Sequence, residues 1–200
     1  MKNKFMMTPR QSLNFVKANL NTFLYNSMIL ARYDVTKEMC ENITNIPDET
    51  EEEIALANFV EAYNYLLEST DIEASYSVLI ELHTILMKGL LDGYHSMLTE
   101  DQIEELNAMI NQPAKANTEI ALDVMIHILD KRLFVDGDVR AAMMFANKIM
   151  VDNGNGFITV SPENAHTFRE KLKAYIDTKE AEPFKDWLYK YCIKGKKVYY

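Results

Sequence analysis

The sequence has 200 residues, with 21 Lys and Arg against 30 Asp and Glu, which gives a formal net charge of −9 and a pI near 5.0. Hydrophobic residues make up 48% of it, and 6 Gly and 5 Pro are few, so a disordered, collagen-like or turn-dense all-β chain is excluded. The acidic balance disfavours a nucleic acid or an anionic membrane as partner, because both need an attractive positive field.

Two cysteines, Cys40 and Cys192, stand far apart and in no Cys-x-x-Cys motif. This usage disfavours a disulfide framework and a structural zinc site. The first residues contain no apolar stretch typical of a signal peptide, and Glu81 and Lys88 interrupt the most apolar segment before it is long enough to cross a bilayer. The sequence therefore predicts a soluble cytoplasmic protein.

Apolar residues recur at helical spacing through the first half of the chain. They predict one helix over Ser12–Tyr33. The acidic run Glu49–Glu53 opens a second helix, which ends near Ser69 and has its carboxylates at the positive end of the helix dipole. A third helix is predicted over Asp71–Gly89, followed by a loop around Gly93.

In the second half, Thr99 is a predicted N-cap, with Gln102 at the capping-box position, for a helix that reaches about Asn111. The remaining predicted elements are helices at Ala116–Asp130 and about 138–153, a short β segment at Phe157–Val160, and helices at Pro162–Asp177 and Pro183–Lys194. The helix at 138–153 is apolar on more than one side, so we expect it at the centre. The predicted fold class is all-α: about eight helices around this central helix, in a single domain over residues 1–200 with tails at 1–10 and 195–200 and at most a short β element.

The loop segment RLFVDGDVR, between the predicted helices at Ala116–Asp130 and 138–153, carries the candidate chemistry. Backbone N–H groups at the start of the following helix point toward a site for an anion. Phe134 is expected to anchor the loop in the core, Asp136 is a candidate Mg²⁺ ligand, and Arg140 is a candidate phosphate-binding side chain. Spacing alone favours an ordinary helix connection, with Asp138 as N-cap and Asp136 in a turn.

At Arg132–Met143 the sequence resembles the signature of the Fic (Fic/Doc) family, which reads HPFx(D/E)GNGRxxR. The resemblance extends over about residues 20–190 and includes an Asn-x-x-x-Ala helix, a Leu-His helix, an N-terminal inhibitory helix and closing helices. The blocks that carry it lie at Glu53–Glu68, Leu79–Leu91, Asn26–Glu38 and Phe157–Leu188. The resemblance implies a helical-bundle fold. It also implies the usual family activity, which is transfer of AMP from ATP to a hydroxyl side chain of a target protein.

Carried over position by position, the resemblance implies a degenerate active site. The His that acts as general base in the family is replaced by Arg132. An arginine stays protonated and has no acceptor atom, so it cannot take the proton from the target hydroxyl. Asp136 matches the acidic metal ligand, Gly137 matches the first Gly of the anion-binding turn, and Arg140 matches the first Arg.

Three further departures are expected to weaken nucleotide binding. Asp138 replaces an Asn and puts a carboxylate beside the expected phosphates. Val139 replaces the second Gly with a β-branched residue where the backbone must approach a phosphate. Met143 replaces the second Arg, which contacts the terminal phosphates in the family.

The inhibitory pattern of the family, (S/T)xxxE(G/N), aligns with Ser27, Ala31 and Arg32. Its Glu pairs with the second Arg of the signature, so Ala31 and Met143 replace both halves of one salt bridge. A buried pair that loses one partner leaves an unpaired charge that costs ~3–5 kcal/mol, whereas replacing both by apolar groups is often neutral. Paired loss predicts a stably folded site that is no longer regulated in this way.

Four other features have simpler interpretations. The run DNGNG at 152–156 resembles part of the signature, but no helix follows it, so we expect a helix cap and turn. His83 and His127 are expected to be partnered core histidines. The basic aromatic end, 189–200, is expected to be frayed rather than a contact patch for an acidic partner or nucleic acid. Residues 92–95 stand where active relatives have a target-docking β-hairpin, yet they lead into a predicted helix.

Two functions remain from the sequence. The first is a catalytically degenerate protein that binds a protein partner or a nucleotide-like anion at Asp136–Arg140, and for which the sequence assigns no cofactor. The alternative is a divergent protein nucleotidyl or phosphoryl transferase that uses Mg²⁺ and ATP or a related nucleotide. In it, Asp136 and Asp138 hold the metal and Arg132 stabilises the transferring phosphate. Ordinary AMP transfer is the least compatible with the missing base. The sequence leaves the partner and the oligomeric state open.

Overall fold

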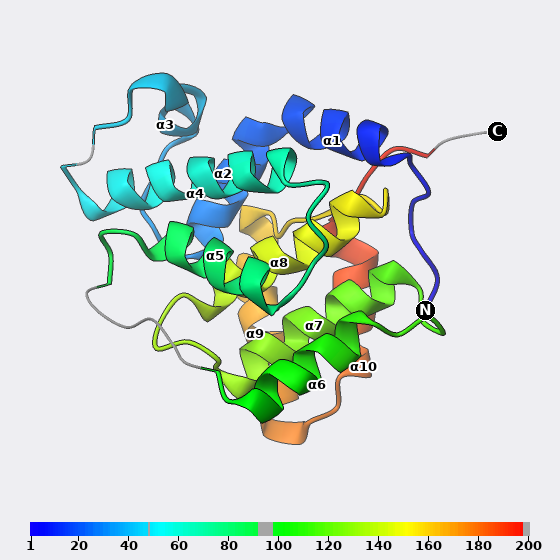
Figure 1. Ribbon diagram of the computed structural model, residues 1–200. Coiled ribbons are helices and arrows are strands. Elements are labelled where there is room, and N and C mark those ends of the chain that lie inside the picture. Colours follow the sequence, from blue (N-terminus) through cyan, green and yellow to red (C-terminus); the bar gives the residue numbers. More distant parts are fainter. Residues whose placement is uncertain (48, 92–97, 198–200) are drawn as a thin grey trace.

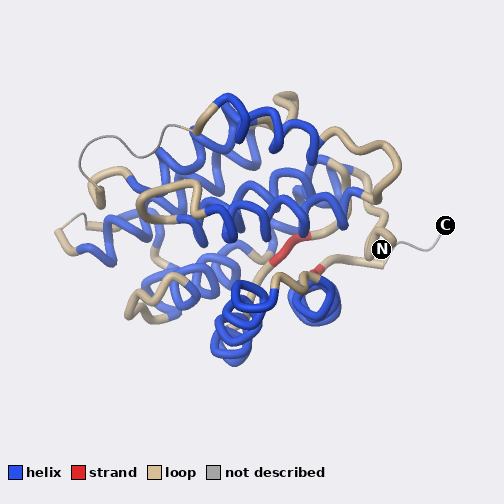
Figure 2. The backbone as a smooth tube through the Cα atoms, turned by 90° about the horizontal axis from the view of Figure 1, so that it is seen from below, coloured by secondary structure: helices blue, strands red, loops and turns tan. Residues whose placement is uncertain are grey.

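The structure is a computed structural model that describes residues 1–47, 49–91 and 98–197. The chain in these ranges is mostly helical, with a small β element near its C-terminal end (Figures 1 and 2). The α-helices are α1 (Pro9–Ala18), α2 (Leu20–Leu30), α3 (Lys37–Glu41), α4 (Glu51–Glu68), α5 (Tyr76–Met87), α6 (Glu100–Ile110), α7 (Asn117–Lys131), α8 (Asp138–Asp152), α9 (Ala165–Thr178) and α10 (Glu182–Trp187). The shorter elements are the 3₁₀ turns η1 (Ile43–Asn45) and η2 (Pro162–Asn164), the π-helical turn η3 (Leu188–Cys192), and the strands β1 (Phe157–Ile158) and β2 (Ile193–Lys194). The predicted all-α fold class is confirmed.

Helix α8 lies at the centre of the molecule, as its sequence predicts (Figure 1). From Arg140 to Val151 every side chain is buried except that of Met143, which is half-buried. The helix packs against α7, α5, α4, α1 and β1. Because apolar side chains on all sides of α8 are covered, this helix fixes where the other helices, and the loop before it, are placed.

One charged side chain lies inside this core. Lys148 on α8 has no exposed surface, and its Nζ donates to the carbonyl oxygen of Ser69 at 2.6 Å and to Asp152 Oδ2 at 2.7 Å. A buried ammonium without such partners would be costly. The Ser69 carbonyl, just beyond the end of α4, is thereby tied to the central helix.

Capping boxes start two helices, of which the one at Thr99 was predicted. Thr50 accepts from the Glu53 N–H and starts α4, and Thr99 accepts from the Gln102 N–H and starts α6, each as a complete capping box. In the interior, the buried side chain of Asn58 donates to the carbonyl oxygens of Leu86 and Lys88 at the end of α5. This side chain therefore satisfies backbone acceptors that the helix end leaves unpaired.

Two predicted helices are wrong in extent in the first half. The single helix over Ser12–Tyr33 is two helices, which change direction at Asn19, where φ is −121° and ψ is 12°. The Asn19 side chain donates to the Phe15 carbonyl and so replaces a helical hydrogen bond at the break. The helix predicted from Asp71 begins only at Tyr76, after the N-cap Ser75.

The predicted helix over Pro183–Lys194 is also shorter than expected. It ends at Trp187, passes through η3, and finishes as β2, which pairs antiparallel with β1. Phe157 lies opposite Lys194, and Ile158 lies opposite Ile193. Both isoleucines are buried, so the strand pairing covers their apolar surface.

Residues 1–10, predicted as a tail, are held against the domain. The Met7 N–H donates to the Gly154 carbonyl at 2.8 Å, and the Met7 side chain is buried. Lys4 Nζ donates to the Tyr189 carbonyl at 2.6 Å. Burial of Met7 and these two links explain why the segment is ordered against the core. Across the described ranges, each helix is too short or too polar to span a membrane.

Candidate functional site

The loop that connects α7 to α8 is anchored from below by α5. Leu133 and Phe134 are buried, whereas Val135 is exposed. The Phe134 ring stacks on the His83 ring with 3.8 Å between centroids, and His83 Nε2–H donates to the Asp136 carbonyl at 2.8 Å. Phe134 therefore has its predicted anchoring position. His83 was predicted only as a partnered core histidine, but it also holds the candidate loop in place.

Gly137 is required by the shape of this loop. Its φ is +84°, and a Cβ atom there would lie 2.6 Å from Met87 Sδ. Its N–H donates to Asp136 Oδ1 at 2.6 Å, so this amide is already satisfied and does not face a ligand. The Gly137 N–H is therefore not free to donate to an anion, as its predicted role would require. Its positive φ is nevertheless a conformation that glycine adopts readily.

Asp136 and Arg140 pair with each other across the first turn of α8. Arg140 Nη2 lies 3.4 Å from Asp136 Oδ2, and Nη1 donates to the Tyr33 hydroxyl at 2.7 Å. The Arg140 side chain is only 8% exposed, whereas that of Asp136 is 67% exposed. The predicted metal ligand and the predicted phosphate-binding arginine are thus brought together. Tyr33, which the sequence analysis did not single out, fixes the guanidinium.

Asp138 faces the loop backbone. Its Oδ1 accepts from the Phe134 N–H at 3.1 Å and so holds the preceding loop. The N-cap predicted at Asp138 is wrong, because Gly137 occupies the N-cap of α8, without a side-chain capping hydrogen bond, and Asp138 is already the first helical residue. Burial raises the pKa of the Asp138 carboxyl to about 6, although the Phe134 N–H and the charge of Arg132 both favour its ionised form. Asp138 also lines the cleft described next.

An open cleft of about 340 Å³ lies above this loop, and two exposed arginines reach it from the C-terminal ends of different helices. Arg132 follows α7 with φ +48°, and Arg32 follows α2 with φ +71°. Both are left-handed, a conformation that side chains other than Gly and Asn seldom adopt. Arg140 lines the same cleft. Arg32 stands where the inhibitory pattern has Gly or Asn, and that preference was the one signal for its backbone conformation.

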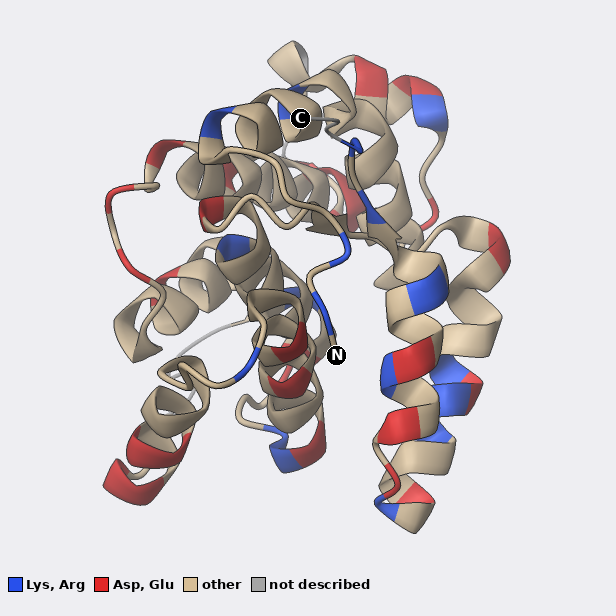
Figure 3. Cartoon of the chain, turned by 90° about the vertical axis from the view of Figure 1, so that its right-hand side faces the viewer, with Lys and Arg blue, Asp and Glu red and all other residues tan. Residues whose placement is uncertain are grey.

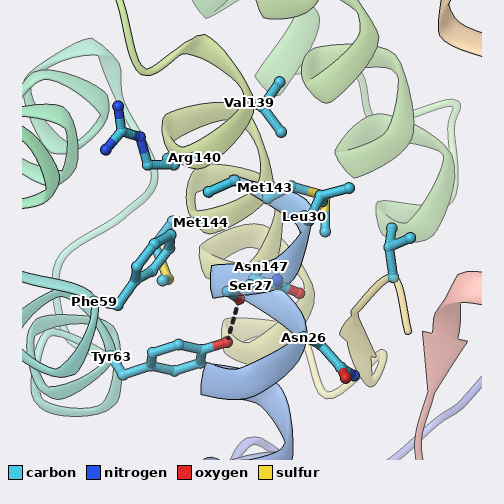
Figure 4. Close-up of a pocket in the computed structure, with 12 residues that line it drawn as sticks. Asn26, Ser27, Leu30, Phe59, Tyr63, Val139, Arg140, Met143, Met144 and Asn147 are labelled. Carbon is cyan, nitrogen blue, oxygen red and sulfur yellow. Dashed lines mark hydrogen bonds between the residues drawn. The ribbon is translucent and has the colours of Figure 1, made fainter. Parts of the chain in front are cut away.

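Beside this cleft, a small cavity of about 20 Å³ separates α2 from α8 (Figure 4). Ser27, Ala31 and Met143, which the resemblance links as a former inhibitory contact, all line it. Ser27 Oγ and Tyr63 Oη are 3.1 Å apart and hydrogen-bonded. Val139 lines both the cavity and the cleft. Ala31 and Met143, which the resemblance aligns with the two halves of a salt bridge, therefore line one cavity with room for about one water molecule.

These side chains fit Mg²⁺ and a triphosphate poorly. Asp136 is the matched metal ligand, but its carboxylate already meets Arg140 and the Gly137 amide. Among the described residues, no three His, Cys, Asp or Glu side chains are grouped so that they could hold a metal ion. Met143, which the resemblance aligns with the arginine that contacts terminal phosphates, carries no charge.

Among the features set aside in the sequence, the end at 189–200 is not frayed over its first residues, where η3 is followed by β2, β2 pairs with β1, and Cys192 and Ile193 are buried, so that prediction is wrong there. Residues 153–156 form a turn after α8, with Gly154 at φ +69°. His127 is buried with Nδ1 3.8 Å from Glu105 Oε1, while its Nε2 has no hydrogen-bond partner, so it is only partly partnered. Three predictions fall on residues outside the described ranges: the loop around Gly93, the segment 92–95, and the end of the chain at Tyr199 and Tyr200.

No family model matches the sequence, and no curated protein matches it significantly. Solved structures do match in fold. A fragment of Fic-1 from C. elegans has 15% sequence identity and a TM-score of 0.74, and the match covers 90% of this chain and 62% of that one. A Fic domain containing signaling protein from Bacteroides thetaiotaomicron has 16% identity and a TM-score of 0.66, with 92% and 86% covered. The chain thus spans less than two thirds of the Fic-1 structure. The arrangement of its helices around α8 is the fold of Fic domain proteins.

Proposed function

We propose that this chain is a catalytically degenerate Fic-fold protein that acts by binding and lacks the ordinary AMP transfer of the family it resembles. The observation that carries the proposal is Arg132, an exposed side chain at the end of α7 in the place of the general-base histidine. Its guanidinium has no acceptor atom and stays protonated at any physiological pH. Loss of a general base alone lowers the rate of a reaction by about 10²–10⁴-fold.

The cleft supports binding of a compact anion at its mouth. Arg32 and Arg132 line it from two helix ends, and Arg140 lines it from α8. The cleft thus combines three arginines with the carboxylates of Asp136 and Asp138, whereas the residues deeper along α8 that line the adjacent cavity include the apolar Val139 and Met143. A single phosphate or carboxylate group suits this distribution better than a triphosphate, whose terminal phosphates would meet Met143.

Thermal unfolding with added ligands tests this proposal. We expect inorganic phosphate to raise the melting temperature of the protein, and we expect Arg132→Gln to lose that increase. Mg²⁺ with ATP is expected to add no Mg²⁺-dependent increase; a ligand at a hundred times its dissociation constant would add ~2.7 kcal/mol of stability. A Mg²⁺-dependent shift with ATP that disappears in Asp136→Ala would contradict the proposal.

Transfer of labelled AMP provides the second test. The protein is incubated with Mg²⁺, ATP labelled at the α-phosphate, and a lysate that contains acceptor proteins. We expect no labelled acceptor with the parent chain, and none with Arg132→His, because Asp138, Val139 and Met143 remain. Robust labelling by the single Arg132→His variant would show that the site still accepts ATP and would overturn this account of the cleft.

One observation favours the transferase as a second candidate. Asp138 has a carboxyl pKa raised to about 6 by burial and lines the same cleft as Arg132. A carboxylate with such a pKa can accept a proton near neutral pH, while Arg132 stabilises the charge of a transferring phosphoryl group. Mg²⁺-dependent transfer from a nucleotide to a protein hydroxyl, abolished by Asp138→Asn, would establish this alternative in place of the binding function.

A further inference from the structure

A second depression, unrelated to the candidate loop, lies where the N-terminal segment, the α1–α2 corner and the C-terminal segment meet. It is a groove of about 1040 Å³ and shares no lining residue with the arginine cleft. One wall contains Phe15, Asn19 and Tyr25 of α1 and α2, and the opposite wall contains Lys190 and the β2 end of the chain. Figure 3 views this side of the molecule, with the N-terminal segment running beside the chain that leads to the C-terminus.

The groove is basic, although the chain as a whole carries a net charge of −9. Four of its lining side chains are lysines and two are glutamates: Lys4, Lys37, Lys190, Lys194, Glu41 and Glu163. Lys4 Nζ donates to the carbonyls of Tyr189 at 2.6 Å and Lys190 at 3.0 Å, so the lysine from the N-terminal segment is fixed next to those of the C-terminal segment. Burial, and then the charge of Lys194, lower the pKa of Lys4. The charges of Lys4 and Lys194 thus oppose each other within the groove.

Aromatic and amide groups lie between these charges. The rings of Phe15 and Tyr25 are half-buried and line the groove, and Lys37 Nζ lies 5.7 Å from the centroid of the Tyr25 ring. Asn21 and Thr22 line it with exposed polar side chains. A surface that alternates cations, aromatic rings and hydrogen-bonding groups can contact the charges, side chains and backbone of an extended chain.

We infer that this groove binds an extended acidic peptide segment of a partner protein. Charge complementarity requires an anionic ligand, and the groove offers dispersed lysine ammonium groups rather than the arginine forks suited to single phosphates. Glu41 and Glu163 favour an acidic peptide over a single-stranded nucleic acid as the ligand. A single-stranded nucleic acid carries a phosphate on every residue and would meet both carboxylates, whereas a peptide can place neutral residues opposite them. This inference does not depend on the proposed function of the arginine cleft.

Fluorescence anisotropy with a defined probe tests the inference. The probe is a fluorescein-labelled peptide in which Glu alternates with Ser and Tyr, and the reference probe has Gln in place of every Glu. The test variant is Lys37→Gln, Lys190→Gln, Lys194→Gln, which keeps Lys4 because that side chain bonds the backbone. The matched control is Lys88→Gln, Lys131→Gln, Lys173→Gln, which removes the same charge from exposed lysines outside the groove.

We expect the Glu probe to bind the parent chain and the control variant alike, with an affinity that falls as salt rises. The groove variant should bind about tenfold more weakly, as three small pairwise contributions imply together. The Gln probe should not bind. Absence of binding by the Glu probe, equal weakening in the control variant, or tighter binding of an oligothymidylate of the same length would each overturn the inference. The last result would identify a nucleic-acid site instead.

Discussion

Arg32 and Arg132 hold left-handed backbone positions that a glycine would occupy at lower conformational cost. Relief of that cost, about 1–2 kcal/mol, exceeds the extra entropy of a glycine in the unfolded chain, about 0.5–1 kcal/mol. We therefore expect Arg32→Gly and Arg132→Gly each to stabilise the protein by about 0.5–1 kcal/mol, which raises the melting temperature by roughly 1–4 °C. Binding of phosphate at the cleft should weaken in the same variants. Calorimetry and phosphate titration measure the two effects.

Lys179 is the matched control for this prediction. It is also left-handed, with φ +60°, but it follows α9, pairs with Asp130 and does not line the cleft. Lys179→Gly relieves the same backbone cost and loses an exposed ion pair of small value. Phosphate binding should be unchanged in it. If Arg32→Gly and Arg132→Gly also leave phosphate binding unchanged, the two arginines do not form an anion site.

Asp138 predicts a pH dependence with a defined sign. Its pKa in the folded protein is about 6, whereas an unfolded chain has an aspartate pKa of about 3.9. Between these values the folded state binds more protons, so the free energy of unfolding falls as pH rises from about 4 to about 6 and then levels off. Asp138→Asn keeps an acceptor for the Phe134 N–H. We expect it to be more stable than the parent above pH ~6 and equally stable below pH ~4. Urea unfolding at a series of pH values would refute this if both proteins gave parallel curves.

At the scale of elements, α2 and α8 face each other across a small cavity where the resemblance places the two halves of an ion pair. Ala31 and Met143 line one small cavity, where a single charge has no partner. We expect Met143→Arg alone to destabilise the protein by about 1–3 kcal/mol. Addition of Ala31→Glu should recover at least about 1 kcal/mol through the new pair. A double-mutant cycle by chemical denaturation measures this coupling, and a coupling near zero would show that the two positions do not face each other.

The elements were predictable from sequence where local signals decide them. The acidic run Glu49–Glu53, the capping box at Thr99 and the all-round apolarity of α8 predicted helices with nearly correct bounds. Local periodicity could not show that the chain bends at Asn19, because the residues on both sides keep helical spacing. It also could not show that the segment after Trp187 leaves the helix, because only β1, distant in sequence, provides its partner. The five-residue α3 is too short for periodicity to reveal.

The candidate site divides in the same way. Asp136, Gly137 and Arg140 are close in sequence, so their proximity followed from one loop and one helix turn. Tyr33 and Arg32 reach that loop only because α2 lies beside α8, which no spacing along the chain reveals. The salt bridge between Asp136 and Arg140 was likewise unforeseen, because separate roles had been assigned to the two side chains.

For the molecule as a whole, a comparison of two glycines in the left-handed conformation distinguishes the free-energy cost of backbone strain from the cost of displacing a packed segment. A Cβ atom on Gly154 would lie 1.8 Å from the Met7 carbonyl oxygen, whereas one on Gly89 would meet its nearest neighbour, Ile54, at 3.5 Å. Gly89→Ala should therefore cost about 1 kcal/mol from backbone conformation alone. Gly154→Ala should cost about 3 kcal/mol or more, because the N-terminal segment must move away. Equal costs, measured by calorimetry, would show that this segment adds little to stability.

The way in which the N-terminal segment is held has a consequence for biosynthesis. Phe5 lies against Gly156 and Gly195, and Lys4 bonds the backbone of Tyr189 and Lys190. The bond from Lys4 to Tyr189 joins residues that are 185 positions apart in the chain. During translation, Lys4 and Phe5 therefore stay unpaired until residues 189–195, which they contact, have been synthesised. If translation is arrested at a series of chain lengths, the N-terminal segment should become resistant to protease only after Gly195 has left the exit tunnel.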